Sequence, residues 1–303
     1  MPTVHLPYVD SAIDHMDRGG ATALWRNLHW GLYDRPDIDD DSPAGYVRAA
    51  AALTEHVVAA AAVVDRGRVV DVGCGFGGTL AHLRERHPAC RLAGVNIDVR
   101  QLRWARRLLD DGAGAGDEGG RRPGGHRGAR SAATAAGGTG AGGRPPAGLV
   151  AADGCRLPFA DRSVDHVLAV ECVFHFPSRK GFFREAARVL RPGGTLAITD
   201  FLLSPGGLAR FVAKNRELAS SDWYGHSAAP VTAAAYARLG RATGFDLLVD
   251  DDVTARTLPT YPARRRLYRE AGAMGGVATI DRVEALALDG AYRYHVIAWR
   301  RAG

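Results

Sequence analysis

A glycine-dense turn at residues 73–78 constrains the fold of this chain more than any other feature. Before the turn, residues 69–72 are branched and apolar except for the acid Asp71, and residues 79–83 can open a helix. The pattern predicts a buried strand, a tight loop and a helix N-terminus in direct succession. Because glycine has no Cβ, such a loop lets the backbone approach a ligand closely.

The segments around this turn alternate between strand and helix patterns. We expect strands over residues 68–72, 91–96, 149–153, 164–170, 195–201, 245–250 and 292–299. We expect helices over residues 46–64, 78–87, 99–109, 178–190, 233–243, 267–271 and 279–288. Strands that alternate with helices predict a parallel sheet covered on both faces, with ligands bound at the carboxyl ends of its strands. The expected fold is therefore α/β, with a Rossmann-like, doubly wound, mostly parallel seven-stranded sheet and an antiparallel C-terminal edge.

Composition suggests how the chain is divided. Residues 112–148 are almost all Gly, Ala, Arg, Ser, Thr and Pro. Such a segment cannot bury enough apolar surface to offset its ordering entropy, so we expect a disordered insertion. We expect residues 1–64 to form an N-terminal helical lid and residues 65–303 to form the core, in which 202–230 has no clear period.

Several classes of protein are disfavoured by what the sequence lacks. No apolar run approaches the roughly 18 residues of a membrane span, and no signal peptide precedes the first helix, so we expect a cytoplasmic protein without membrane insertion. The four scattered cysteines and the histidines show no metal-ligand spacing, and we expect no metal. The net charge of +6 is modest and is partly carried by residues 112–148, so no nucleic-acid partner is expected. We expect a monomer or a homodimer.

The residues near the glycine turn indicate which ligand it holds. Residues 73–78 satisfy the G-x-G-x-x-G pattern of dinucleotide sites, which alone is a weak signal. Asp71 at the end of the first strand would repel a pyrophosphate, and it suits a cationic ligand such as an ammonium group beside a sulfonium. Asp153 ends the third strand, where an acid can accept a hydrogen bond from an adenine amino group. An NAD(P)-dependent oxidoreductase remains an alternative, which Asp71 opposes.

Together these residues resemble a known family. Residues 71–77 resemble the first motif of the class I S-adenosylmethionine-dependent methyltransferases, residues 153–159 their adenine-binding motif, and residues 190–194 the turn before their fifth strand. The resemblance implies S-adenosyl-L-methionine as cofactor. It also implies a set of cofactor-binding residues: Asp71, Gly73, Cys74, Gly75, Gly77, Asn96, Ile97, Gln101, Asp153 and Gly154.

The second strand departs from the common pattern of that family. Many members end this strand with an acid that holds the ribose, whereas here Asn96 stands in that place and Gln101 follows. This resembles the branch of sterol, tocopherol, cyclopropane-fatty-acid and natural-product methyltransferases. Amide side chains can both donate and accept, so ribose hydroxyls can still be satisfied. We expect Asp98 to cap the following helix.

Three residues are candidates for the chemistry. Glu171 follows the fourth strand and resembles a glutamate of sterol- and terpene-type C-methyltransferases, where it could stabilise a cation or take a proton. His175 could act as a base, and His29 is a weaker candidate within residues 24–34, which resemble a segment that closes over the cofactor. The alternatives are that Glu171 bonds nearby backbone amides, that His175 caps a helix, and that residues 24–34 pack as a surface helix.

The expected function is methyl transfer to a small-molecule acceptor, a natural product or isoprenoid-like metabolite, at carbon or oxygen. Residues 202–230 are expected to supply part of the acceptor pocket, including His226. The alternatives are a methyltransferase acting on RNA or protein, the oxidoreductase named above, and a cofactor-binding scaffold without catalysis.

Overall fold

The computed structural model describes residues 6–20, 25–35, 40–111, 147–217, 223, 225 and 229–303. The segment expected to be a disordered insertion lies almost wholly outside these residues, as do His226 and other parts of 202–230.

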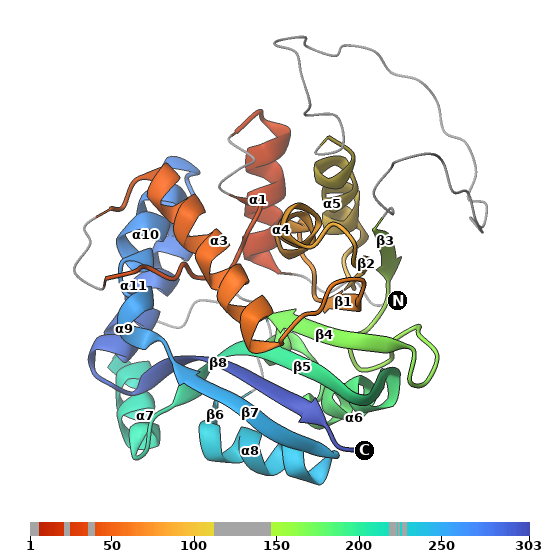
Figure 1. The fold of residues 1–303 in the computed structure, drawn as a ribbon. Helices are drawn as coiled ribbons and strands as arrows, with labels where there is room; N and C mark the ends of the chain where they lie inside the picture. The colour runs from red at the N-terminus through yellow and green to blue at the C-terminus, as the bar shows by residue number, and fades with distance from the viewer. Residues whose placement is uncertain are drawn as a thin grey trace.

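The described residues form one eight-stranded sheet in the order β3-β2-β1-β4-β5-β8-β7, with β6 paired to the end of β5 (Figure 1). The strands are β1 (Arg68–Val72), β2 (Arg91–Asn96), β3 (Gly148–Ala151), β4 (Val164–Val170), β5 (Leu190–Leu203), β6 (Val231–Thr232), β7 (Phe245–Asp252) and β8 (Tyr292–Arg301). Strands β1 to β6 pair in parallel, whereas β8 is antiparallel to both β5 and β7. This confirms the doubly wound sheet with an antiparallel edge. The two-residue β6 was not expected, because it is too short to show an alternating pattern.

Helices cover both faces of the sheet. The described helices are α1 (Pro7–Asp17), α3 (Pro43–Ala60), α4 (Gly78–Arg86), α5 (Val99–Asp111), α6 (Arg179–Val189), α7 (Gly207–Glu217), α8 (Ala233–Ala242), α9 (Thr254–Thr257), α10 (Thr260–Glu270) and α11 (Met274–Leu288). Helices α3, α4 and α5 lie on one face and α6 and α8 on the other (Figure 1). Each face of the sheet forms a hydrophobic core with the helices that cover it. Strand β1 contributes to both cores, because Val69 packs on the face covered by α3, α4 and α5, while Val70 and Val72 pack on the face covered by α6 and α8.

Several segments differ from the sequence-based expectation: for example, the helix expected over 267–271 begins at Thr260, and the short helix α9 was not expected. The residues expected to form a turn before the fifth strand, 191–194, instead lie within β5, where the register shifts between the pairs Val164–Leu190 and His166–Thr195. A shift of this kind lets a strand keep its pairing while it absorbs extra residues. Helix α7 lies in the stretch without a clear period.

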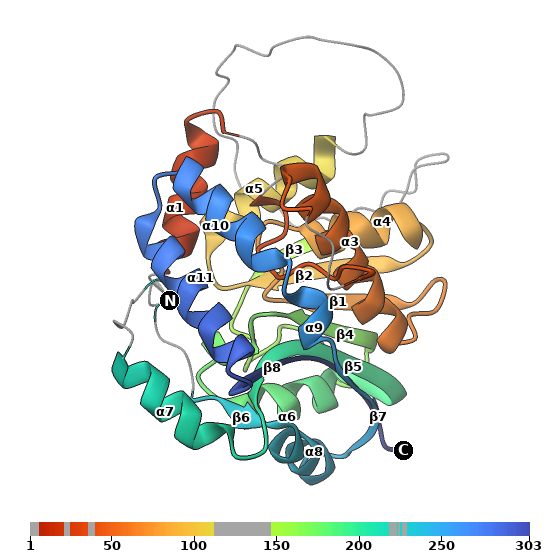
Figure 2. The same ribbon diagram turned by 90° about the vertical axis from the view of Figure 1, so that its left-hand side faces the viewer.

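The N-terminal region has two structural parts. Helix α3 packs on the sheet, since Leu53 and Val57 share a core with Leu168 and Val296. Residues 25–33, which we call the strap, instead follow an irregular path and contact α1 and α10, which lie beside α11 (Figure 2). The boundary between a lid and a core at residue 64 stays a prediction.

Aromatic side chains hold the strap in the core. Trp25 and Trp30 are fully buried. The Trp25 ring lies 5.9 Å from the Tyr268 ring, and the Trp30 ring lies 5.6 Å from the Tyr261 ring, both measured between centroids. Because both tyrosines belong to α10, the strap is packed against a helix from the last part of the chain.

Candidate active site

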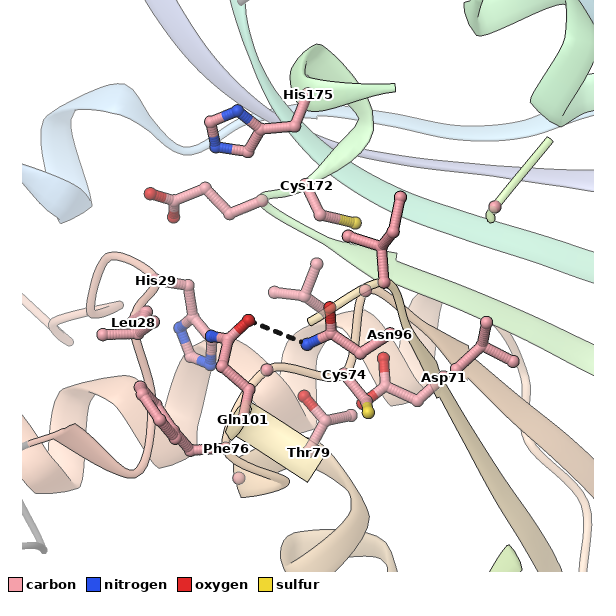
Figure 3. Close-up of a pocket in the computed structure, with 18 of the residues that line it drawn as sticks. Leu28, His29, Asp71, Cys74, Phe76, Thr79, Asn96, Gln101, Cys172 and His175 are labelled. Carbon is pink, nitrogen blue, oxygen red and sulfur yellow. Dashed lines mark hydrogen bonds between the residues drawn. The ribbon is translucent and has the colours of Figure 1, made fainter. Parts of the chain in front are cut away.

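A cavity of about 170 Å³ lies at the carboxyl ends of β1, β2 and β4, with the strap along one side (Figure 3). All the predicted cofactor residues except Gly77 line it: Asp71, Gly73, Cys74, Gly75, Asn96, Ile97, Gln101, Asp153 and Gly154. Glu171, His175 and His29 line it as well. The parallel sheet therefore brings the residues singled out from separate motifs to one site.

Asp71 is the buried acid of this cavity. Its side chain is only 2% exposed, and Oδ2 has no hydrogen-bond partner among the described residues. Burial raises the pKa of Asp71 to about 7. An unpartnered buried carboxyl oxygen is costly, and a cationic hydrogen-bond donor in the cavity would relieve that cost. The carboxyl group of Asp71 therefore suits a ligand that carries an ammonium group.

The glycines of the turn have different tasks. Gly73 and Gly75 both have positive φ, of 75° and 51°. A Cβ on Gly73 would lie 2.6 Å from the Cys172 sulfur, whereas a Cβ on Gly75 would meet only the Gln101 amide, at 3.7 Å. Gly73 thus permits close packing against the residues after β4, while Gly75 supplies a backbone conformation beside open space.

Gly77 was predicted to bind the cofactor, but it is not among the cavity-lining residues. It is the N-cap of α4 with a φ of 86°, and a Cβ there would lie 3.0 Å from the Ala105 Cβ of α5. Its visible contribution is to bring α4 and α5 together.

The end of β2 carries linked amides. Asn96 Nδ2 donates a 2.9 Å hydrogen bond to Gln101 Oε1 (Figure 3), and Asn96 Oδ1 accepts one from the Asp98 backbone over 3.2 Å. Asp98 Oδ1 accepts a 2.8 Å hydrogen bond from the Arg100 backbone, as expected for a residue that caps α5. Asn96 and Gln101 thus line the cavity, whereas the Asp98 side chain caps α5.

Asp153 and Gly154 form the next wall of the cavity. Asp153 Oδ1 accepts a 2.8 Å hydrogen bond from the Cys155 backbone. A Cβ on Gly154 would lie 2.9 Å from the Phe176 ring. A carboxylate beside an aromatic ring is the arrangement that the adenine-binding interpretation requires.

Glu171 is held more tightly than any other candidate. It follows β4 with a φ of 53°, a conformation that costs about 1–3 kcal/mol in a residue other than glycine. Its Oε2 accepts hydrogen bonds of 2.8 Å from the Trp30 backbone N–H and of 2.8 Å from the Tyr294 hydroxyl. Burial raises the pKa of Glu171 to about 8, against the lowering effect of these hydrogen bonds and of Arg264.

His175 lies across the cavity from Gln101 and Asp71 (Figure 3). Its Nε2 is 3.3 Å from the Tyr8 hydroxyl, and the two rings stack with centroids 5.8 Å apart. Tyr8 also lines the cavity, although no sequence pattern ranks it above the other aromatic residues near the N-terminus.

His29 belongs to the strap. Its Nδ1 lies 2.8 Å from the Trp30 carbonyl oxygen and its Nε2 lies 3.2 Å from the Thr54 hydroxyl. Burial lowers the pKa of His29 to about 4. The ring is therefore neutral at physiological pH, and its polar atoms serve the strap.

The backbone of the strap is held by side chains that sequence reasoning missed. Arg264 Nη1 donates to the Leu28 carbonyl over 3.0 Å, and the Tyr46 hydroxyl donates to the Asn27 carbonyl over 2.8 Å. The Thr260 hydroxyl bonds both the N–H and the C=O of Gly31, at 2.9 and 3.2 Å. No local pattern marks these residues, because their partners are far away in the sequence.

Four other described histidines have ordinary structural contacts. His56 pairs with Asp251, His82 with Glu55, His166 with Thr195 and His295 with Asp250, all at 2.7 or 2.8 Å. Within the described residues we found no cluster of His, Cys, Asp or Glu able to hold a metal ion. None of the described helices is long and apolar enough to span a membrane.

Comparison with known proteins identifies the family. A family profile described as a methyltransferase domain matches residues 129–198. The chain is 30% identical over 248 residues to methyltransferase GfsG of Streptomyces halstedii, covering 78% of this chain and 72% of that protein. It is also 30% identical over 249 residues to 27-O-demethylrifamycin SV methyltransferase of Amycolatopsis mediterranei, covering 78% and 74% of the two chains.

The chain belongs to the S-adenosylmethionine-dependent methyltransferases. This methyltransferase also shares its fold with geranyl diphosphate C-methyltransferase from Streptomyces coelicolor, at a TM-score of 0.66 and 16% identity, over 99% of this chain and all of that one. The enzyme thus uses S-adenosyl-L-methionine and acts on a small-molecule acceptor. These findings set aside the oxidoreductase alternative.

Proposed function

We propose that this methyltransferase methylates an uncharged, largely apolar natural product or isoprenoid-like metabolite at carbon or oxygen, with Glu171 as the proton acceptor. The observation that carries the proposal is that the half-buried carboxyl group of Glu171 lines the same cavity as Asp71, whose Oδ2 has no partner among the described residues. Asp71 is suited to bind the cofactor, and Glu171 is available to the methyl acceptor.

The charges of the cavity support an acceptor without phosphate or carboxylate groups. Three acids, Asp71, Asp153 and Glu171, line it, and the one arginine among its described lining residues, Arg26, lies 3.5 Å from Glu85. A phosphate or carboxylate group on the acceptor would therefore find no arginine or lysine among these lining residues that is not already paired. Leu6, Leu28 and Phe176 supply apolar surface.

The residues that would hold the cofactor follow from the site. Asp71 would accept from its amino group, the amides of Asn96 and Gln101 would bond its hydroxyls, and Asp153 would accept from its adenine. Bound S-adenosylmethionine supplies an electrophilic methyl group on a sulfonium. The chain's own residues orient the reactants and exclude water.

Glu171 is suited to receive a proton. The strap and the sheet bury its carboxyl group, and Oε2 is engaged by Trp30 and Tyr294. At a hydroxyl acceptor, the carboxylate would take the proton that methylation releases. At an alkene, it would stabilise the positive charge and then remove a proton from carbon. His175, with Tyr8 at its Nε2, is the second candidate for proton transfer.

We also infer a reducing, cytoplasmic location, and a monomer or homodimer. The four cysteines support the location, because Cys74, Cys90, Cys155 and Cys172 are all free in the structure. Size-exclusion chromatography with light scattering would test the oligomeric state.

The test of the proposed function separates binding from chemistry. Calorimetry would measure the affinity for S-adenosylhomocysteine of the wild type, Asp71→Ala and Glu171→Gln. Mass spectrometry would then measure methylated product from a panel of neutral terpenoid and polyketide acceptors, with geranyl diphosphate as the charged comparison. We expect Asp71→Ala to lose binding, and Glu171→Gln to keep binding while product formation falls about 10²- to 10⁴-fold. Full turnover by Glu171→Gln, or preferred methylation of the diphosphate, would contradict the proposal.

A further inference from the structure

Three neighbouring strands contribute to a closed ring of hydrogen bonds around Glu171. The Glu171 backbone N–H donates to Thr199 Oγ1 over 2.9 Å, Thr199 Oγ1 and the Tyr294 hydroxyl lie 3.0 Å apart, and Tyr294 donates to Glu171 Oε2 over 2.8 Å. A tyrosine hydroxyl has only one proton. Because Tyr294 gives that proton to the carboxyl, the Thr199 hydroxyl donates in the contact between them.

The sheet sets the geometry of this ring. Glu171 follows β4, Thr199 lies on β5 and Tyr294 on β8, and these strands are adjacent. Thr199 is paired with Val170 on one side and with Val296 on the other. Thr199 and Tyr294 are both buried, at 0% and 1% exposed. The ring therefore anchors both ends of Glu171, its backbone in the left-handed conformation and its carboxyl group.

The ring also distinguishes the two carboxyl oxygens. Oε2 receives donors from Trp30 and Tyr294, whereas no hydrogen bond to Oε1 joins it to a described residue. A proton on the carboxyl group would therefore sit on Oε1, because Oε2 already accepts two N–H or O–H donors. Oε1 is the oxygen that can give or take a proton.

Resting on the proposed role of Glu171, we propose that Tyr294 is a positioning residue that, together with Thr199, holds Glu171 so that Oε1 is the oxygen offered to the methyl acceptor. Tyr294 itself is absent from the cavity lining. It acts on the acceptor only through the carboxyl group of Glu171.

The surroundings of Glu171 predict how this role can be measured. Burial raises its pKa, the Trp30 amide, Arg264 on α10 and the Tyr294 hydroxyl lower it, and Asp200 on β5 raises it. The other titratable groups that interact with Glu171 are Tyr8 on α1, Tyr46 on α3, Tyr261 on α10 and the thiol of Cys172. These four are neutral near pH 7, since burial raises the pKa of each. Loss of the Tyr294 hydroxyl should therefore raise the pKa of Glu171 further.

The experiment follows the Glu171 carboxyl carbon by NMR in the full chain labelled with carboxyl-¹³C glutamate, without any acceptor. Glu171→Gln assigns the signal. We expect Tyr294→Phe to raise the midpoint of the Glu171 titration by about 0.5–1 pH unit, the size of one lost hydrogen bond. Tyr292→Phe is the matched control, because Tyr292 lies on the same strand and contacts Phe201 as Tyr294 does, but has no interaction with Glu171. It should leave the midpoint unchanged.

A second pair of variants covers the case in which Tyr294→Phe does not fold. Thr199→Val should raise the same midpoint, and Thr199→Ser, which keeps a hydroxyl group, should restore it. An unchanged titration in folded Tyr294→Phe, or in Thr199→Val, would overturn the inference. Because the titration needs no turnover, it can succeed or fail independently of the product test for Glu171.

Discussion

Asn96 Nδ2 and Gln101 Oε1 form a 2.9 Å hydrogen bond between the end of β2 and the first turn of α5. The bond orients two amides where many related enzymes use an acid. We predict that Gln101→Ala weakens S-adenosylhomocysteine binding by about 2- to 10-fold, the loss expected for one hydrogen bond. Asn96→Ala should weaken it more, because the Asp98 N–H also loses its partner. Native affinity of both variants in calorimetry would show that the amides do not bind the ligand.

Asp71 makes the ligand-free protein sensitive to pH. Its pKa rises from 3.8 unfolded to about 7 folded, so between these values the unfolded chain has lost a proton that the folded protein keeps. Stability therefore falls as pH rises through this window, by at most about 1.4 kcal/mol per pH unit from this group. We predict that Asp71→Asn unfolds at a higher temperature than the wild type above pH 7, with little difference at pH 4.

The same substitution should weaken S-adenosylhomocysteine binding, since it removes the acid that suits the ammonium group. Thermal unfolding measured from pH 4 to 8, with and without S-adenosylhomocysteine, checks both parts. A variant less stable than the wild type at pH 8 in the absence of ligand would contradict the interpretation of Asp71.

Two glycines with positive φ, Gly77 and Gly193, allow the effect of backbone strain on stability to be separated from the effect of packing. Gly77→Ala would add a Cβ at 3.0 Å from Ala105 in a residue with a φ of 86°, whereas Gly193→Ala, at a φ of 79°, would have nothing within 4 Å. We predict a loss of about 1–2 kcal/mol in the free energy of unfolding for Gly193→Ala from the left-handed conformation alone. Gly77→Ala should lose more. Urea denaturation measures the difference, and equal losses would argue against close packing of α4 on α5.

Thr260 is expected to matter for ligand binding although it is distant in sequence from every motif. Thr260→Val leaves the buried Gly31 N–H and C=O without their partner, at a cost of about 1–3 kcal/mol. Thr257→Val is the control, because its equally buried hydroxyl bonds the Thr254 carbonyl within α9. We predict that only Thr260→Val weakens S-adenosylhomocysteine binding and exposes the strap to proteolysis. If both variants bind the ligand alike, the strap does not depend on Thr260.

We predict that the fold tolerates deletion of the segment between α5 and β3 up to residue 146, but not beyond it. Ala147 is 3% exposed and belongs to the core, and its carbonyl accepts from Arg106 over 3.4 Å. Replacing residues 112–146 by a short Gly-Ser bridge should leave the melting temperature nearly unchanged, since closure entropy depends weakly on loop length. Extending the deletion through Gly148 should lower it. A large loss from the shorter deletion would show that the segment has a structural role.

All but one of the residues predicted for the cofactor side of the site line one cavity, because that side is built from local motifs. Asp71 and the turn glycines follow one another in the chain, Asn96 ends β2 and Asp153 lies two residues after β3, so the parallel sheet alone brings them together. The acceptor side could not be predicted in the same way. Tyr8 lines the cavity, whereas Arg264 and Tyr294 support it from outside by bonding Leu28 and Glu171, and the spacing of these residues carries no periodic signal. Gly77 belongs to the same motif as the other turn glycines, but it lies outside the cavity lining and brings α4 and α5 together.

The long sequence separation between the strap and its partners has a consequence for biosynthesis. Gly31 bonds a residue 229 positions later, and Leu28 one 236 positions later. On the ribosome, the strap therefore emerges long before α10 can hold it, and Trp25 and Trp30 remain without their tyrosine neighbours on α10 during that interval. A chain arrested after β5 would contain the whole glycine turn, but it would lack the α10 residues that hold the strap beside the cavity. The chain should therefore bind its cofactor only near the end of synthesis. Until then, the apolar side chains of the strap would offer chaperones a binding site near the N-terminus.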